Sequence, residues 1–121
     1  MITEDFVSFE TAKLLKEKGF DSGDCKNSPH YAYSADGQFS GPSWDTKYPA
    51  PTLQMAMKWL REEKGVAVIP IISGVLDDEK FLWDIEIVVA KTHDSYSQGW
   101  VYEKQEAACE AAIKYCIENL I

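Results

Sequence analysis

Residues 48–66 carry the pattern that most restricts how this chain can fold. At about 100° per residue, their apolar side chains cover an arc of roughly 200° around a helix that Thr52 would cap. These side chains are Leu53, Met55, Ala56, Met57, Trp59 and Leu60. Because an ordinary surface helix has a narrower apolar stripe, we predict a central helix covered by a sheet on one side and by another helix on a second side. The methionines would also suit an adaptable recognition groove, but core packing accounts for every residue of the arc.

Two more helices are predicted from the signals at their ends and from their periodicity. Ser8 is placed to cap a helix that runs to about Lys18, where Gly19 and Phe20 have the order of a Schellman ending. In residues 103–119, apolar side chains recur on one helical face and charged ones at spacing four on the other. The chain is therefore predicted to begin and end in helices that each bury one stripe.

Two hairpins are predicted between these helices. Their strands are residues 30–35 and 38–40, which flank the turn dipeptide Asp36-Gly37, and residues 66–72 and 81–90, which flank an acidic turn at 74–80. The alternation is clearest in the last strand, whose core-facing set is predicted to be Phe81, Trp83, Ile85, Ile87 and Val89. On this basis Trp59 of the central helix should meet Trp83 across the helix–sheet interface.

One strand has the features of a sheet edge. Pro70 cannot donate to a ladder, so residues 66–72 are predicted to lie at an edge or to carry a bulge. This strand is more apolar than an exposed edge should be, which predicts a cover. Residues 92–102 show no period and are read as a long loop, and either they or a second copy of the protein would supply the cover. We predict a self-covered monomer or a weak homodimer.

The order helix, hairpin, helix, hairpin, helix predicts an α+β fold in which a four-stranded, mainly antiparallel sheet packs with three helices. The 121 residues have the length of a single domain, 1–121, which can bury roughly two-thirds of the surface that its unfolded chain exposes. A chain of this size needs no disulfide or metal to be stable.

Charge and cysteine content exclude several classes of partner. Twelve Lys and Arg stand against twenty Asp and Glu, a formal charge of −8, and no Lys/Arg cluster provides the footprint of a nucleic-acid-binding protein. No run of about 18 apolar residues and no signal-peptide pattern occurs, so we predict a cytoplasmic protein with no membrane partner. Three cysteines without a Cys-x-x-Cys pair fit free thiols in a reducing compartment.

Both ends and the middle of the chain have a distinctive amino-acid sequence, in residues 2–10, 12–20, 48–62 and 110–121. In these segments the sequence resembles a group of small uncharacterised proteins of gut bacteria, their prophages and other mobile elements. The resemblance implies no activity, cofactor or catalytic residue, because none is established for the group. Residues 21–47 and 94–102 depart from the group's pattern, which marks them as loops where recognition of a particular partner is expected.

Residues able to perform catalysis or bind metals form no recognisable pattern. His30 and His93 lack His-x-x-x-His spacing, while Cys109 and Cys116 fall on the apolar stripe of the last helix. Cys25 has no catalytic signature beside it, which favours a surface thiol over a nucleophile. The common glycine-rich nucleotide motifs and the hydrolase motifs are also missing from the sequence. We therefore assign no catalytic residue, metal site or cofactor.

An enzyme is the alternative function. Asp84 and Glu86 lie two apart on one strand face, and the enzyme would have a pocket between the sheet and the loop at residues 92–102 and use Asp84, Glu86 or His93. A weaker alternative is an acidic inhibitor that mimics nucleic acid, which the twelve interspersed basic residues disfavour.

Aromatic residues outside the helices are the remaining signal. They lie in the first hairpin and in the irregular segments, and the set is Tyr31, Tyr33, Trp44, Tyr48, Tyr96, Trp100 and Tyr102. Tyr and Trp supply large, rigid contact area at low entropic cost, so these residues are the predicted partner surface. The predicted function is a noncatalytic binding or accessory module of the mobile-element-associated group, with a protein as partner.

Overall fold

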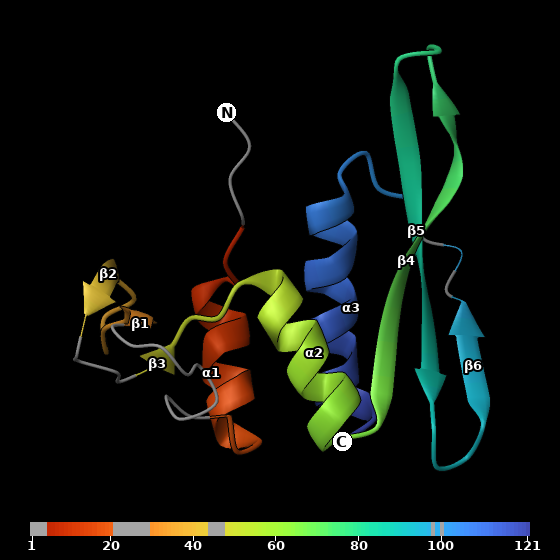
Figure 1. Cartoon of the computed structure of the whole chain (residues 1–121). Coiled ribbons are helices and arrows are strands. Elements are labelled where there is room, and N and C mark those ends of the chain that lie inside the picture. Colours follow the sequence, from red (N-terminus) through yellow and green to blue (C-terminus); the bar gives the residue numbers. More distant parts are fainter. Residues whose placement is uncertain (1–4, 21–29, 44–47, 98, 100) are drawn as a thin grey trace.

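The computed structural model describes residues 5–20, 30–43, 48–97, 99 and 101–121, and Figure 1 shows their arrangement. The elements are α1 (Phe9–Glu17), β1 (His30–Tyr33), β2 (Phe39–Ser43), β3 (Tyr48–Pro49), α2 (Leu53–Glu63), β4 (Val66–Leu76), β5 (Lys80–Val89), β6 (Asp94–Ser97) and α3 (Gln105–Asn119). The fold is α+β with three helices in the described chain, as predicted. None of these helices combines the length and apolar character needed to cross a membrane.

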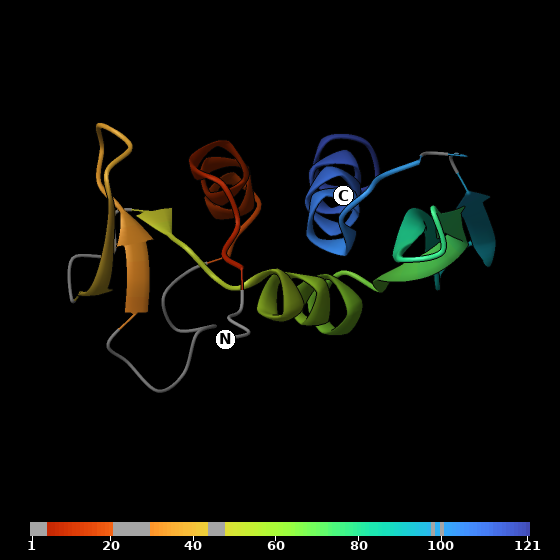
Figure 2. The same cartoon turned by 90° about the horizontal axis from the view of Figure 1, so that it is seen from above.

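The strands form two sheets, so the predicted single four-stranded sheet is wrong. The small sheet has the order β2-β1-β3 and the large sheet the order β4-β5-β6, with antiparallel pairing throughout. Each predicted hairpin gains a short third strand from nearby in the sequence, which costs less loop-closure entropy than joining two hairpins across α2. The helices lie between the two sheets, as the views from the side and from above both show (Figure 1, Figure 2).

The predicted helix ends are confirmed. Ser8 and Thr52 cap α1 and α2, and each side-chain oxygen accepts a hydrogen bond of 3.2 Å from the backbone N–H three residues on. At the end of α1, Gly19 has φ of 102° and the N–H of Phe20 donates to the carbonyl oxygen of Leu15 at 3.0 Å. This is the predicted Schellman ending, in which glycine takes the left-handed conformation without steric cost.

The central position of α2 is confirmed by its burial. Five of the six side chains on the predicted arc are buried, namely Leu53, Ala56, Met57, Trp59 and Leu60, and only Met55 is exposed. The helix packs against β4 of the large sheet and against α3. The broad apolar arc therefore indicated correctly that two neighbours cover this helix.

The predicted contact between Trp59 and Trp83 is wrong, although both residues lie in the described part of the chain. The Trp59 ring packs edge-on against Phe20, with centroids 5.4 Å apart, while Trp83 contacts Phe81 at 6.2 Å. Trp83 is only partly buried at the margin of the core, bridged to Tyr102, beyond the fully buried Ile85 and Ile87 of the same strand. Phe81, also predicted to face the core, is 51% exposed.

β4 is an edge strand, as Pro70 predicts. The N–H of Ala90 donates to the carbonyl oxygen of Gly65 at 2.9 Å, which sets the phase of the β4–β5 ladder. Because bonded and non-bonded pairs alternate along antiparallel strands, the nitrogen of Pro70 points away from β5, toward the free edge. Proline thus withholds a donor from this edge, which is one way that natural sheets limit edge pairing.

The prediction that residues 92–102 form a loop covering this edge is wrong. Residues 94–97 are β6, which pairs with β5 on the side opposite β4, and Tyr102 forms a further bridge with Trp83. Two serines in β6 give the segment a weak strand pattern, and its pairing follows from the open backbone groups along the second edge of β5. The acidic turn is also shorter than predicted, because Gly74 belongs to β4.

Pro70→Val is expected to promote self-association, because it restores an outward donor on a strand that carries no charged residue. Sedimentation velocity at micromolar concentration should show a monomer or weak dimer for the natural chain and a larger species for the variant. Adding Ile71→Lys to the variant should reverse the change. Equal sedimentation of Pro70→Val and the natural chain would show that Pro70 does not protect the edge.

Candidate functional site

An exposed group of aromatic rings lies on the small sheet, and we call Phe6, Tyr31 and Phe39 the aromatic surface. Tyr31 of β1 and Phe39 of β2 stack with centroids 5.5 Å apart and an interplanar angle of 10°. Phe6 completes the group, with its centroid 4.5 Å from that of Tyr31 and 5.3 Å from that of Phe39. Tyr31 is 38% exposed and Phe39 45% exposed. The rings therefore present ordered apolar area to solvent, the kind of area that binding sites on proteins use.

Tyr33 connects the aromatic surface to α1. Its ring lies 5.2 Å from that of Phe39 and 5.4 Å from that of Phe9 in α1. The Tyr33 hydroxyl donates a hydrogen bond of 2.7 Å to the carbonyl oxygen of Val7. Burial, and after it the negative charge of Glu110, raises the pKa of Tyr33, so the phenol remains a donor at neutral pH. The sheet is thereby tied to the start of α1.

Two lysines of α1 contact aromatic rings that neighbour the aromatic surface. The Lys13 ammonium lies 5.1 Å from the centroid of the Phe9 ring, and the Lys16 ammonium lies 5.1 Å from that of Tyr48. Each such cation–π contact contributes roughly 0.5–1 kcal/mol at an exposed site. Gly37, with φ of 88°, brings the hairpin turn against Phe9, where a Cβ would lie 3.1 Å from the ring. Both the positive φ and the close approach of the Phe9 ring favour glycine at this position.

The seven aromatic residues predicted as a partner surface do not form one surface. Tyr31, Tyr33 and Tyr48 come together on the small sheet, whereas Tyr96 and Tyr102 lie on the large sheet, partly buried against the core. Trp44 and Trp100 lie outside the described residues. The candidate surface is therefore confined to the first of the two sheets.

Sequence reasoning missed Phe6, Phe9 and Phe39. The position of Phe39 could have been predicted from the sequence, because a short turn at residues 34–38 sets it opposite Tyr33 in the neighbouring strand. Phe6 is brought to the sheet by a bridge to Thr52, a contact across 46 positions that no local pattern indicates. Phe9 lies in the first turn of α1, where its ring was not expected to meet a strand.

Of the residues of the enzyme alternative, Asp84 and Glu86 share one face of β5, where serines of β6 donate to both carboxylates, but His93 lies apart from them. The Asp84 side chain is buried, and its Oδ1 accepts a 2.6 Å hydrogen bond from the N–H of Ile85. This N–H belongs to a part of β5 that β6 does not pair with. Glu86 accepts a 2.8 Å hydrogen bond from a serine of β6. His93 lies beyond the far end of β5, past Val89, and at about 3.3 Å per residue it is roughly 15 Å or more along the sheet from Asp84. This set does not form an acid–base pair.

The cysteines of α3 are buried, as their place on its apolar stripe predicts. Burial raises the pKa of Cys109 to about 11, with a smaller contribution from the charge of Glu106, and raises that of Cys116 to about 12. Both thiols are therefore protonated and unreactive at neutral pH. Cys25 lies outside the described residues, and those that are described contain no His, Cys, Asp and Glu group suited to a metal ion.

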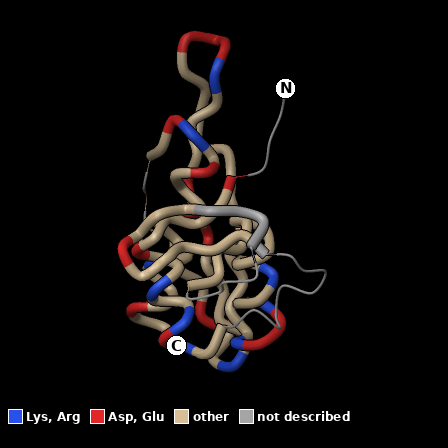
Figure 3. The backbone as a smooth tube through the Cα atoms, turned by 90° about the vertical axis from the view of Figure 1, so that its left-hand side faces the viewer, with Lys and Arg blue, Asp and Glu red and all other residues tan. Residues whose placement is uncertain are grey.

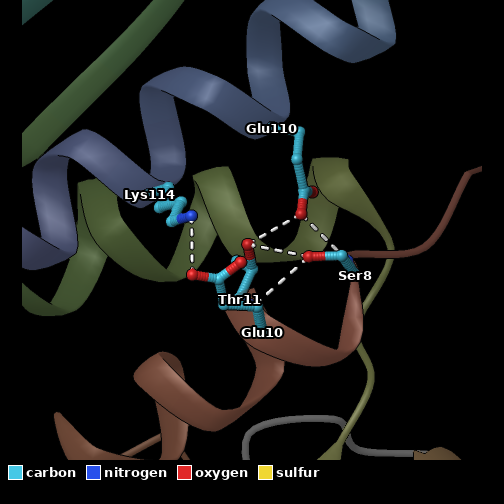
Figure 4. Close-up of polar contacts among 5 residues, drawn as sticks. All are labelled: Ser8, Glu10, Thr11, Glu110 and Lys114. Carbon is cyan, nitrogen blue, oxygen red and sulfur yellow. Dashed lines mark hydrogen bonds and ion pairs between the residues drawn. The ribbon is translucent and has the colours of Figure 1, made fainter. Parts of the chain in front are cut away.

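A cluster of Ser8, Thr11 and Glu110 resembles a set of catalytic side chains, but its hydrogen bonds join α1 to α3 (Figure 4). Glu110 Oε1 accepts from the backbone N–H of Ser8 at 2.9 Å and from the buried Thr11 hydroxyl at 2.7 Å. Ser8 Oγ accepts from the Thr11 N–H and donates to Thr11 Oγ1 at 3.1 Å. A carboxylate at the start of α1 also complements the helix dipole. These contacts give the cluster a structural role.

Glu110→Ala is expected to lower the free energy of unfolding by about 1.5–3 kcal/mol, because two donors lose a charged acceptor and one of them is buried. The matched control is Lys114→Ala, which removes the exposed 2.7 Å ion pair to Glu10. The control should change stability by less than about 1 kcal/mol. Urea unfolding measures both, and equal losses would contradict a structural role specific to Glu110.

Comparison with known proteins gives no relative from which to transfer a function. No family model matches the chain, and neither the curated proteins nor the solved structures include a match.

Proposed function

We propose that the protein is a noncatalytic binding or accessory module that recognises a protein partner through the aromatic surface. The observation that carries this proposal is the stacked pair Tyr31–Phe39, which remains exposed although most other large apolar residues of the described chain are buried or partly buried. Rings held in place by Phe6 and Tyr33 lose little entropy on binding, which is the property of interface hot spots.

The setting of the surface favours one kind of partner. Lys13 and Lys16 stand on the α1 side of the cluster, so a segment with apolar side chains and flanking carboxylates would complement it. The resemblance to proteins of mobile elements supports a cytoplasmic setting and a partner from the bacterial host or the element itself. Figure 3 shows acidic and basic residues interspersed along the described backbone, and this pattern does not favour an inhibitor that mimics nucleic acid.

Affinity capture from host-cell lysate tests the proposal with three forms of the full chain. The natural chain should retain a specific protein, and the double variant Tyr31→Ser/Phe39→Ser should lose it by at least tenfold. The control is Ile69→Ser, which changes a residue 41% exposed on the large sheet. Retention of the same protein by the double variant, or no retained protein with any form, would contradict the proposal.

A further inference from the structure

A second apolar area lies on the half of the β4–β5 hairpin that projects past the start of α3, and we call residues 72–83 the arm (Figure 1). Ile72 is 53% exposed, Val75 57% and Phe81 51%. The register pairs Ile72 with Trp83 and Val75 with Phe81, so these side chains share one face of the arm. Three half-exposed side chains leave on the order of 300 Å² of apolar area in water, a size at which a surface patch is often functional.

The apolar face of the arm is a continuation of the side of the large sheet that packs against the core. Because side chains alternate along β5, Phe81 and Trp83 point to the same side as Ile85 and Ile87, which are fully buried. Over that buried half the face is covered by α2 and α3. Among the described residues, no helix extends this cover onto the arm (Figure 1, Figure 2). The arm therefore presents an uncovered continuation of a surface that elsewhere binds helices.

The charges around the arm are mainly negative. Its tip carries Asp77, Asp78 and Glu79 beside Lys80, and Figure 3 shows this acidic end of the hairpin. At the base of the arm, Tyr102 bridges to Trp83, and this bridge brings the start of the α3 segment next to the apolar face. That segment carries two acidic residues, Glu103 and Glu106, and one basic residue, Lys104. Five acidic and two basic residues thus border the arm, and they favour a cationic partner.

We propose that the apolar face of the arm binds a cationic amphipathic helix of a protein partner, which extends the layer formed by α2 and α3. The helix would place its apolar side on Ile72, Val75 and Phe81 and its Lys or Arg residues toward the acidic tip and the start of α3. This is the helix-in-groove mode of recognition, here on a sheet face. The site lies on the large sheet, so it is separate from the aromatic surface and does not depend on the function proposed for that surface.

A second copy of the chain fits this face less well. Two arms packed face to face would bury about 600 Å² in total, below the roughly 1,200 Å² of a stable interface. They would also bring together two chains that each have a formal charge of −8. A cationic helix gains from the same charges that oppose a dimer.

The test uses a fluorescently labelled synthetic helix of leucine and lysine, about five turns long, with its leucines on one face. Its anisotropy is measured against the full chain, beside a matched helix of leucine and glutamate. We expect the Leu/Lys helix to bind in the micromolar range and more weakly as salt rises. Phe81→Ser should weaken binding at least tenfold, whereas Ile69→Ser, on the opposite face of the same hairpin, should not change it.

A second variant tests the charge contribution without changing the apolar face. Asp77 and Asp78 have φ of 53° and 58°, and asparagine accepts this left-handed conformation, so Asp77→Asn/Asp78→Asn should fold normally. It should weaken the Leu/Lys helix severalfold. Absence of binding, equal binding of the Leu/Glu helix, or insensitivity to Phe81→Ser would overturn the proposal. So would sedimentation that shows a dimer of the natural chain dissociated by Phe81→Ser.

Discussion

Trp59→Ala is expected to lower the free energy of unfolding by about 3–5 kcal/mol. The Trp59 side chain is only 7% exposed and lies on α2, the helix that contacts both the large sheet and α3. Its ring packs edge-on against Phe20, the residue that closes the end of α1. Alanine would leave a cavity between Phe20 and α2 and remove the support of the Schellman ending.

Urea unfolding monitored by far-UV circular dichroism measures this effect. Met55→Ala is the matched control, because it shortens an apolar side chain of the same helix that is 37% exposed. The control should cost less than about 1 kcal/mol. A similarly small loss for Trp59→Ala would mean that α2 does not occupy the centre of the core.

Alkaline pH is expected to destabilise the protein through its two buried thiols. An unfolded cysteine has a pKa of 9.0, while burial raises the pKa of Cys109 to about 11 and that of Cys116 to about 12. Between these values the folded chain holds more protons than the unfolded chain, so stability falls as the pH rises. Below the unfolded pKa the ionisation of the thiols does not change the free energy of unfolding. By pH 10.5 their combined ionisation should lower it by roughly 4 kcal/mol.

The double variant Cys109→Ala/Cys116→Ala isolates the contribution of the thiols. Its free energy of unfolding should be lower than that of the natural chain at pH 8, because two buried side chains are shortened. From pH 8.5 to 10.5, however, its stability should fall less steeply than that of the natural chain, because it lacks the two thiols. Some loss of stability should remain in both proteins, since tyrosines and lysines titrate in both. Parallel curves would show that the thiols are not shielded from water in the folded state.

Local sequence signals predicted the helices well because the causes of their ends are local. Ser8 and Thr52 each satisfy a backbone donor three residues away, and Gly19 adopts a conformation that its missing side chain permits. The breadth of the apolar arc on α2 likewise depends only on residues one or two turns apart. These features could be predicted without knowledge of the tertiary structure.

The arrangement of the strands depended on contacts that the sequence does not display. Short strands such as β3, with two residues, and β6, with its two serines, form because a neighbouring strand offers open backbone groups. The alternation of Phe81 to Val89 correctly indicated a face but not how far the helices would cover it. Half of that face therefore lies on the arm, outside the helix cover, and for this reason the predicted contact of Trp83 with Trp59 is not formed.

The candidate site was predicted in part. Tyr31 and Tyr33 were both in the predicted partner surface, and they share a face of the first hairpin because side chains two apart on a strand point the same way. Phe6 joined them through a contact distant in sequence, and Tyr96 and Tyr102 went to the other sheet. The composition of a loop does not reveal which sheet its aromatic residues will join.

Site-specific photocrosslinking tests directly whether a partner binds at the aromatic surface. A benzoylphenylalanine placed at position 39 keeps an aromatic ring on the surface, and the same residue at position 69 of the large sheet is the control. In host-cell lysate, position 39 should crosslink to one protein, and that crosslink should disappear when Tyr31→Ser is added. Crosslinks from position 69 alone, or identical crosslinks from both positions, would contradict the account.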